Sequence, residues 1–380
     1  MSRIVWKSIT PWNDYPSLVA RKVAAGDLDL IQAPIGLVVR AWARFGLIRP
    51  LDSLLVPLAE TIGDIFTGAI QACTNDGKLY GIPFVASPGE NLLLYNRSKF
   101  DAAGLPFPRS TWTLDDLVNA AQELNVLNDN AHPDQFSYIP HYDLPGMLSA
   151  LRTFGADLIT AEGTESPTVS TLLAMLQWYH SLVYERQVFP KPFELAGGPL
   201  ATFRQGKAAM IRQSFGTLAD MSTPDADWLG ATLWPSHPQT GARGASLSGL
   251  AFCLAVSSPQ PSASIEWCKY LSNSENGVRM FSEGCSAPGC RASSWQEPSV
   301  MRRFPISSEN AKIAIQARPE PVPWNLRQTE IYRAWQLYSE SLWYDRITPE
   351  ECAAGFVQAC QKILELPALT SQDQLSEELR

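Results

Sequence analysis

The sequence lacks the features that mark membrane-spanning, nucleic-acid-binding and disordered proteins. No apolar run approaches the roughly 20 residues that cross a bilayer. Lys and Arg total 30 against 38 Asp and Glu, and the positive residues are scattered, so we expect no nucleic-acid partner. Apolar residues make up 45% and charged residues 18% of the chain, which predicts a folded globular protein.

The motifs of common metal and cofactor enzymes are also missing. The sequence contains no H-E-x-x-H, G-x-S-x-G or C-x-x-C motif, and no G-x-G-x-x-G follows a predicted strand. We therefore expect no metal, no cofactor and no catalytic activity. A glycosidase stays open as an alternative, because its two carboxylates have no signature spacing and Glu90 or Asp143 could serve.

The seven cysteines form two classes. Five lie in apolar or helical contexts and are predicted to pack in cores: Cys73, Cys253, Cys268, Cys352 and Cys360. The other two, Cys285 and Cys290, delimit a turn-rich loop, Cys-Ser-Ala-Pro-Gly-Cys. A disulfide between them is one possibility, but spacing alone does not establish a bridge.

Helix and strand signals alternate along the chain. The order strand 4–7, helix 14–25, strand 28–32 and a helix ending near Phe45 favours a parallel sheet with helices on its faces. Thr113 with Asp116, and Thr348 with Glu351, are predicted to cap helices. Further helices are expected at 169–184, 261–271 and 328–343, and further strands at 92–95, 208–212, 230–234 and 250–256. The class is α/β.

Three clusters of Gly, Pro and Ser, at 87–89, 246–249 and 318–321, interrupt this pattern. A chain of 380 residues exceeds the size at which a single core stops growing, so two lobes are expected. Three breaks suit a chain that crosses between two lobes more than once.

Several blocks together resemble family 1 of the extracellular solute-binding proteins, the group that includes maltose-binding protein. They occur in family order over nearly the whole chain: A-G-D-L-D-L-I at 25–31, W-A-R-F-G-L-I-R-P-L-D at 42–52, G-K-L-Y-G-I-P at 77–83 followed by L-Y-N at 94–96, A-G-L-P at 103–106 and T-W at 111–112, F-R-Q-G-K-A-A-M at 203–210, and I-T-P-E-E at 347–351. Most of these residues also suit the role of fold determinants.

The resemblance implies a two-lobed periplasmic-binding-protein type II fold, with doubly wound sheets joined by a hinge and a ligand held between the lobes. The N-terminal lobe would comprise residues 1–88 and 249–318, and the C-terminal lobe 89–248 and 319–380. Compared with the family, the chain is expected to begin at the second strand, so that one β-α unit is missing.

Ligand residues are expected on loops at strand ends and at the crossings. A sugar needs aromatic rings for its C–H faces and a few placed polar groups for its hydroxyls. The resemblance adds an aromatic contact near Tyr142 and a backbone that runs past the sugar at Ser248 and Gly249. The candidates are Trp12, Asn13, Asp14, Ile35, Gly36, Ser87, Glu90, Tyr142, Asp143, Phe215, Trp234, Ser248, Gly249, Trp324 and Asn325.

The resemblance implies a monomeric substrate-binding protein of an ABC importer, which binds a mono- or oligosaccharide and delivers it to membrane permease subunits. Such proteins act in the periplasm or at the cell surface, whereas residues 1–6 lack the apolar core of an export signal, so a genuine start here would leave the protein cytoplasmic. The alternatives are a non-sugar solute (glycerol phosphate, a polyamine or a peptide), a carbohydrate-active enzyme, or a truncated copy that no longer binds.

Overall fold

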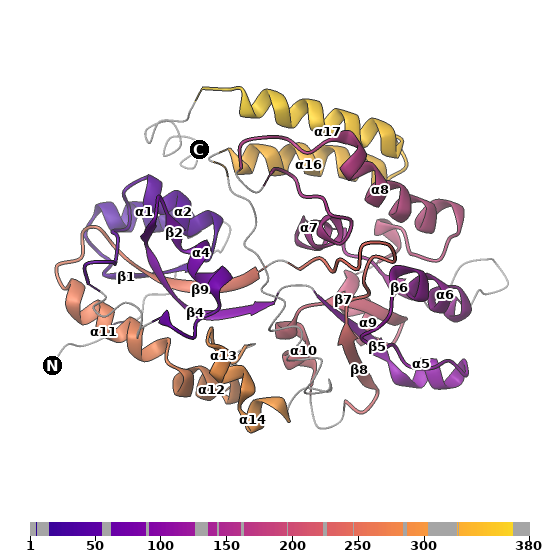
Figure 1. The fold of residues 1–380 in the computed structure, drawn as a ribbon, viewed down its shortest axis with the longest axis horizontal. Coiled ribbons are helices and arrows are strands. Elements are labelled where there is room, and N and C mark those ends of the chain that lie inside the picture. The colour runs from indigo at the N-terminus through magenta and orange to yellow at the C-terminus, as the bar shows by residue number, and fades with distance from the viewer. Residues whose placement is uncertain are drawn as a thin grey trace.

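The computed structural model describes residues 5, 15–54, 62–88, 91–125, 136–142, 144–160, 163–195, 197–222, 226–245, 247–283, 287–302, 325 and 327–367. Figure 1 shows two lobes side by side, each built around its own sheet, with the helix pair α16 and α17 above the second. The predicted α/β class is thus confirmed. None of the helices described is both long and apolar enough to cross a membrane.

The first lobe contains a three-stranded sheet of order β1-β9-β4. Its strands are β1 (Leu30–Pro34), β4 (Gly81–Pro88) and β9 (Leu247–Leu254), and β9 runs antiparallel to both neighbours. Both neighbouring pairs among the described strands of this sheet are therefore antiparallel, not parallel as the alternation of elements suggested. The reason is that β9 returns from the other lobe, which the order of the first few elements cannot show.

Short helices surround this first sheet. They are α1 (Tyr15–Ala24), α2 (Leu37–Arg44), α4 (Thr67–Ala72), α11 (Pro261–Leu271), α12 (Ser274–Ser282), α13 (Ala292–Gln296) and α14 (Pro298–Met301), together with a small hairpin of β2 (Thr74–Asn75) and β3 (Lys78–Leu79). The predicted strand at 4–7 lies almost wholly outside the described residues. The predicted helices at 14–25 and 261–271 are confirmed as α1 and α11.

The second lobe contains a four-stranded sheet of order β6-β7-β5-β8. Its strands are β5 (Leu92–Asn96), β6 (Phe136–Ile139), β7 (Ala208–Gln213) and β8 (Leu229–Leu233). β6 is parallel to β7, and β5 is antiparallel to both β7 and β8. β6, β7 and β8 therefore all point the same way, opposite to β5.

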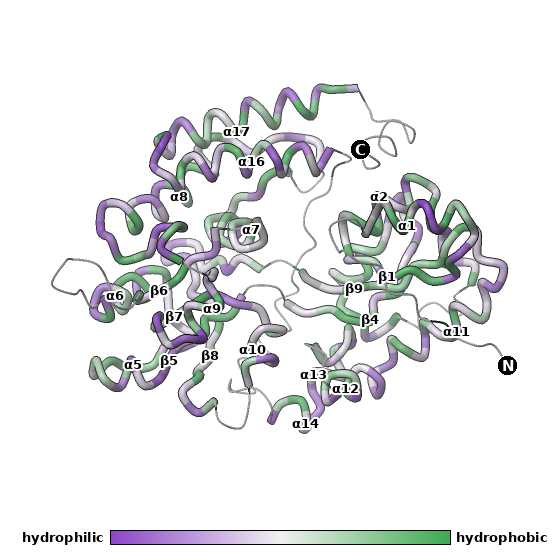
Figure 2. The backbone as a smooth tube through the Cα atoms, turned by 180° about the vertical axis from the view of Figure 1, so that it is seen from behind, coloured by the Kyte–Doolittle hydropathy of each residue, from purple (hydrophilic) through white to green (hydrophobic). Residues whose placement is uncertain are grey.

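The helices of the second lobe are α5 (Arg97–Ala102), α6 (Leu114–Leu124), α7 (Leu144–Thr153), α8 (Val169–His180) with the π-helical turn η2 (Ser181–Glu185), the 3-10 turn η3 (Pro192–Glu194), α9 (Pro199–Arg204), α10 (Phe215–Met221), α16 (Gln328–Trp343) and α17 (Pro349–Leu364). Both predicted capping boxes are present, at Thr113 for α6 and Thr348 for α17. Figure 2 shows α16 and α17 alternating between hydrophilic and hydrophobic colours, as expected for helices with one buried face.

A hydrophobic seam lies between the second sheet and the helices α12 to α14. It joins Leu92, Ile211 and Phe215 of the second lobe to Phe281 and Trp295 of α12 and α13 in one buried cluster. The rings of Phe215 and Trp295 meet edge to face, with centroids 5.2 Å apart. The two lobes are thus packed against each other on this side, besides being linked by the chain.

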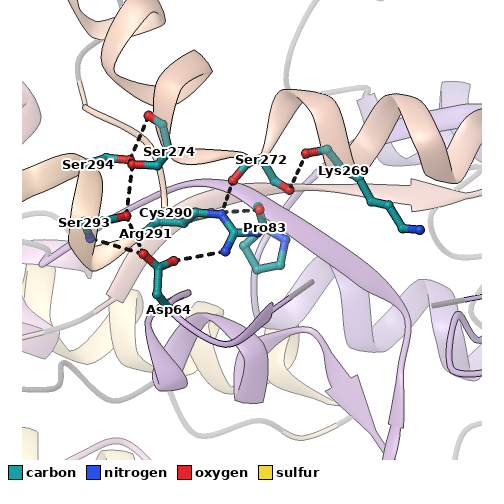
Figure 3. A network of polar contacts seen from close by, with 9 residues as sticks. All are labelled: Asp64, Pro83, Lys269, Ser272, Ser274, Cys290, Arg291, Ser293 and Ser294. Atoms are coloured by element: carbon teal, nitrogen blue, oxygen red, sulfur yellow. Dashed lines mark hydrogen bonds and ion pairs between the residues drawn. The ribbon is translucent and has the colours of Figure 1, made fainter. Parts of the chain in front are cut away.

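A polar network ties the segment before α4 to the start of α13 (Figure 3). Asp64 pairs with Arg291 Nη1 at 3.0 Å and accepts hydrogen bonds from the hydroxyl and the backbone N–H of Ser293. Arg291 is the N-cap of α13 but offers no side-chain cap of its own. Asp64 therefore acts as the N-terminal cap of α13 from a distant part of the chain.

Replacing Asp64 with alanine should lower the free energy of unfolding by about 1–2 kcal/mol, because Ser293 N–H and the Arg291 guanidinium lose their acceptor. Urea unfolding measures this. The matched control is Glu283→Ala, which removes an exposed ion pair to Arg279 of 3.3 Å and should change stability by less than about 0.5 kcal/mol. Equal effects of the two substitutions would contradict the capping role.

Candidate functional site

In both lobes, the carboxyl ends of strands meet the crossing segments. In the second lobe, β7 ends at Gln213 and β8 at Leu233, both opposite Leu92, where β5 begins. In the first lobe, β4 ends at Pro88, opposite Leu247, where β9 begins. One crossing joins 88 to 92 and the other joins 233 to 247, so both sheets turn these edges toward each other. Ligands of open α/β sheets bind outside such carboxyl ends.

The edge of the first lobe is formed mainly by backbone. Ile35 N–H donates to the carbonyl of Gly249 at 3.1 Å, and Gly36 N–H donates to the carbonyl of Ala72 at 3.0 Å. Ser87 is buried and lies opposite Ser248 in the β4–β9 ladder. A Cβ on Gly249 would lie 2.3 Å from the carbonyl oxygen of Val85, so no side chain fits there. Gly249 therefore packs tightly against β4, and the passage of its backbone past a ligand stays a prediction.

The edge of the second lobe carries buried polar side chains. His141 Nε2 lies 2.9 Å from the carbonyl oxygen of Arg212 and 2.8 Å from Gln213 Nε2. One ring nitrogen carries either a proton or a lone pair, so it cannot donate to the carbonyl and accept from the amide together. A protonated Nε2 donates to the Arg212 carbonyl and requires the Gln213 amide to present its oxygen instead. His141 and Gln213 form one coupled polar unit.

A buried arginine lies beside this unit. Arg212 is 1% exposed, its guanidinium carbon lies 4.3 Å from the ring centroid of Trp234, and its Nη2 donates to the carbonyl of Gly244 at 2.6 Å. Trp234 N–H in turn donates to the carbonyl of Asn91 at 2.7 Å. Within the described ranges, Asn91 Oδ1 and Trp234 Nε1 are buried and have no hydrogen-bond partner. An acceptor and a donor are thus left unsatisfied at this edge, which is unusual for buried groups.

The crossing from residue 233 to residue 247, which returns the chain to the first lobe, is bonded to the second lobe. Gly244 N–H donates to Thr153 Oγ1 at 3.0 Å, and Arg152 Nη1 donates to the carbonyl of Ala245 at 2.9 Å. Arg152 is itself paired with Asp157 at 2.8 Å. These contacts fix where the chain leaves the second lobe for β9, and hence how the two edges face each other.

Comparison with known families agrees with this arrangement. The model of the bacterial extracellular solute-binding proteins matches residues 3–302, which is more than half of the chain. The chain belongs to this family. A comparison with curated proteins gives no significant match.

Solved structures confirm the two-lobed fold of this solute-binding protein. An ABC substrate-binding protein from Listeria monocytogenes in complex with cycloalternan has a TM-score of 0.79 at 18% identity, covering 93% of this chain and 89% of that one. A solute-binding protein from Thermotoga lettingae bound with α-D-tagatose has a TM-score of 0.73 at 20% identity, covering 93% and 89%. Maltose-bound MalE3 of T. maritima has a TM-score of 0.71 at 19% identity, covering 92% and 89%.

The solute-binding protein brings only part of the predicted site together. Ile35, Gly36, Ser87, Ser248 and Gly249 meet at the edge of the first lobe, as described above. Six candidates lie outside the described residues: Trp12, Asn13, Asp14, Glu90, Asp143 and Trp324. The role of each candidate as a ligand contact stays a prediction.

The other candidates have structural partners in the second lobe. Trp234 is 1% exposed beneath Arg212, and Phe215 is fully buried in the seam. Tyr142 donates from its hydroxyl to the carbonyl of Pro190, and burial raises its pKa well above the ordinary value. Asn325 accepts from Arg327 N–H at 2.8 Å and donates to the carbonyl of Gly163 at 2.7 Å, just before α16.

Sequence reasoning overlooked the polar residues of the second edge: Asn91, His141, Arg212 and Gln213. A signal was available, because Arg212 and Gln213 end an otherwise apolar strand, where a buried polar residue calls for explanation. Tyr332 was also overlooked. Its burial raises its pKa to about 12, and it lies within electrostatic reach of Asp157 and Arg152, the pair that holds the crossing.

The described cysteines are all free and buried, as predicted for Cys73, Cys253, Cys268, Cys352 and Cys360. Cys290 is also a free thiol, with Sγ 2.9 Å from the carbonyl oxygen of Pro83, and burial raises its pKa to about 12. Cys285 lies outside the described residues, so the predicted pair stays untested. In the part of the chain that the structure describes, no group of three His, Cys, Asp or Glu could hold a metal ion.

Proposed function

We propose that this solute-binding protein is the substrate-binding component of an ABC importer and holds a carbohydrate between the edges of its two lobes. The observation that carries the proposal is the match to the extracellular solute-binding proteins over residues 3–302, in a fold shared with sugar-bound structures. The two lobe edges meet at the crossings, where ligands of open α/β sheets bind.

The similar structures support a carbohydrate as the ligand. They share only the fold at 18–20% identity, but they hold cycloalternan, tagatose and maltose. We propose that the lobes comprise residues 1–88 with 249–318 and 89–248 with 319–380. Closure of the lobes would then follow from ligand contacts with both, because a ligand shifts an equilibrium only by its differential affinity for the two states.

The proposal includes the partners and the place of action. The family is extracellular, so we propose that the protein works in the periplasm or at the cell surface, as a monomer that delivers its ligand to membrane permease subunits. Binding without turnover is proposed, since transport requires that the ligand be released intact.

The test is a thermal-shift and calorimetric screen of the full chain against mono- and oligosaccharides, with chromatography of the ligand afterwards. A specific saccharide at 100 times its Kd should add about 2.7 kcal/mol to the free energy of unfolding and be recovered unchanged. Recovery of a cleaved saccharide would show an enzyme instead. If no saccharide raises the unfolding temperature but a polyamine, peptide or glycerol phosphate does, the ligand is that solute and not a carbohydrate.

A further inference from the structure

Two aromatic rings of the second lobe stack at the surface. Phe193, in the turn η3, is 61% exposed, and Tyr344, which follows α16, is 46% exposed. Their centroids lie 6.2 Å apart and their planes differ by 29°. Single exposed apolar residues are common, but two large rings from segments far apart in sequence that share one exposed surface indicate a binding surface.

Both rings are held in place without a ligand. Lys191 N–H donates to Glu194 Oε2 at 2.6 Å and closes the turn that presents Phe193. On the other side, the hydroxyl of Tyr184 donates to the carbonyl of Trp343, directly before Tyr344. A surface that is ordered beforehand loses less conformational entropy when it binds.

The stacked rings are linked to the edge of the second lobe through one side chain. Tyr142 follows β6 at that edge, and its hydroxyl donates to Pro190, three residues before Phe193. The ring of Tyr142 lies 5.4 Å from that of Trp343, the residue before Tyr344. One side chain at the edge therefore contacts both segments that carry the exposed rings.

Charged groups of both signs surround the rings. Lys191 Nζ lies 5.8 Å from the ring centroid of Phe193, and Arg346 Cζ lies 5.3 Å from that of Tyr344. Glu194 follows Phe193 in the sequence, and Asp345 follows Tyr344. Rings that accept apolar C–H faces, with donors and acceptors beside them, match a neutral polyhydroxylated ring better than an anion or a cation.

We propose that Phe193 and Tyr344 form an outer subsite for a further ring of an oligosaccharide whose first ring lies at the interlobe edge. This inference rests on the proposed function and narrows it, because it makes the ligand an oligosaccharide. The two rings would contribute to the binding of a di- or trisaccharide and not to that of a monosaccharide.

The experiment compares Phe193→Ala with the wild-type protein by titration calorimetry. The probes are glucose, maltose and maltotriose, and mannose, mannobiose and mannotriose. In the series that binds, Phe193→Ala should lower the affinity for the trisaccharide about tenfold. The affinity for the monosaccharide should stay within about twofold of the wild-type value. Phe193→Tyr, which keeps a ring, should retain most of the trisaccharide affinity.

The matched control is Tyr270→Ala in the first lobe. Tyr270 is 45% exposed and stacks on Trp267 at 5.3 Å, but it lies on α11, away from the crossings. Tyr270→Ala should leave the affinity for every saccharide probe unchanged. If the wild type binds saccharides and Phe193→Ala binds them all equally well, the subsite is overturned and the proposed function stands. If the wild type binds no saccharide either here or in the wider screen described above, both are overturned.

Discussion

Alanine in place of Gly244 should lower the free energy of unfolding by about 3 kcal/mol or more. A Cβ on this residue would lie 1.9 Å from the carbonyl oxygen of Ser149 and 2.5 Å from the backbone nitrogen of Thr153. Both atoms belong to the backbone of α7, so neither can move aside as a flexible side chain would. Relief of the clash requires that the crossing or the helix shift, and overpacking of this kind commonly costs about 1–3 kcal/mol.

The clash should also break the anchor of the crossing. Displacement of residue 244 removes the 3.0 Å bond to Thr153 and the 2.6 Å bond from Arg212. Arg212 would then keep its position over Trp234 but lose a partner for a buried cation, which adds to the cost. Because the crossing sets how the two edges face each other, the affinity for the ligand should fall as well.

Gly241→Ala is the control for Gly244→Ala. Gly241 lies three residues earlier with φ +70°, and no atom lies within 4 Å of a Cβ built there. Its substitution meets only backbone strain, about 1 kcal/mol, and should leave ligand affinity unchanged. Urea unfolding and calorimetry on both variants separate the two effects. If Gly244→Ala proves no more costly than Gly241→Ala, the crossing is not packed against α7 as described.

Local signals in the sequence predicted the helices well. The capping boxes at Thr113 and Thr348 depend on residues three apart, and the structure contains both. The predicted helices at 261–271 and 328–343 are confirmed as α11 and α16. A helix is decided by its own residues and their spacing, so one sequence contains enough information to locate it.

Strand direction and the site depend on residues far apart in the chain. β9 runs antiparallel to β1 and β4 because the chain passes through the other lobe between β4 and β9. No local sequence pattern encodes that route. The polar unit at the second edge joins His141 to Gln213, 72 residues away. The packing of Phe215 shows the same limit, since no local pattern indicates that this residue lies buried against Trp295, 80 residues away in the sequence.

Trp295 should be the most costly aromatic residue of the seam to remove. It is 1% exposed, its indole N–H donates to the carbonyl of Gly289 at 3.1 Å, and its ring contacts both Phe215 and Phe66. Trp295→Ala should lower the free energy of unfolding by about 3–5 kcal/mol, because a large buried ring is lost and the backbone on both sides limits collapse of the cavity. Urea unfolding followed by circular dichroism measures the loss.

Trp267→Ala controls for the loss of an indole as such. Trp267 lies on α11, is only partly buried and stacks on Tyr270, so its removal should cost about 1 kcal/mol. A stability loss for Trp295→Ala that is no larger would mean that the seam contributes little.

A double-mutant cycle tests whether the seam couples the two lobes. Phe215 belongs to the second lobe and Trp295 to a helix beside the first. Their contact therefore couples the stability of one lobe to that of the other. The effects of Phe215→Ala and Trp295→Ala should fall short of additivity by about 0.5–3 kcal/mol, because the first substitution already removes the contact. With the seam weakened, the lobes lose packing that unites them, and unfolding should change from one transition into two. Additive effects with a single transition would show that this contact does not couple the lobes.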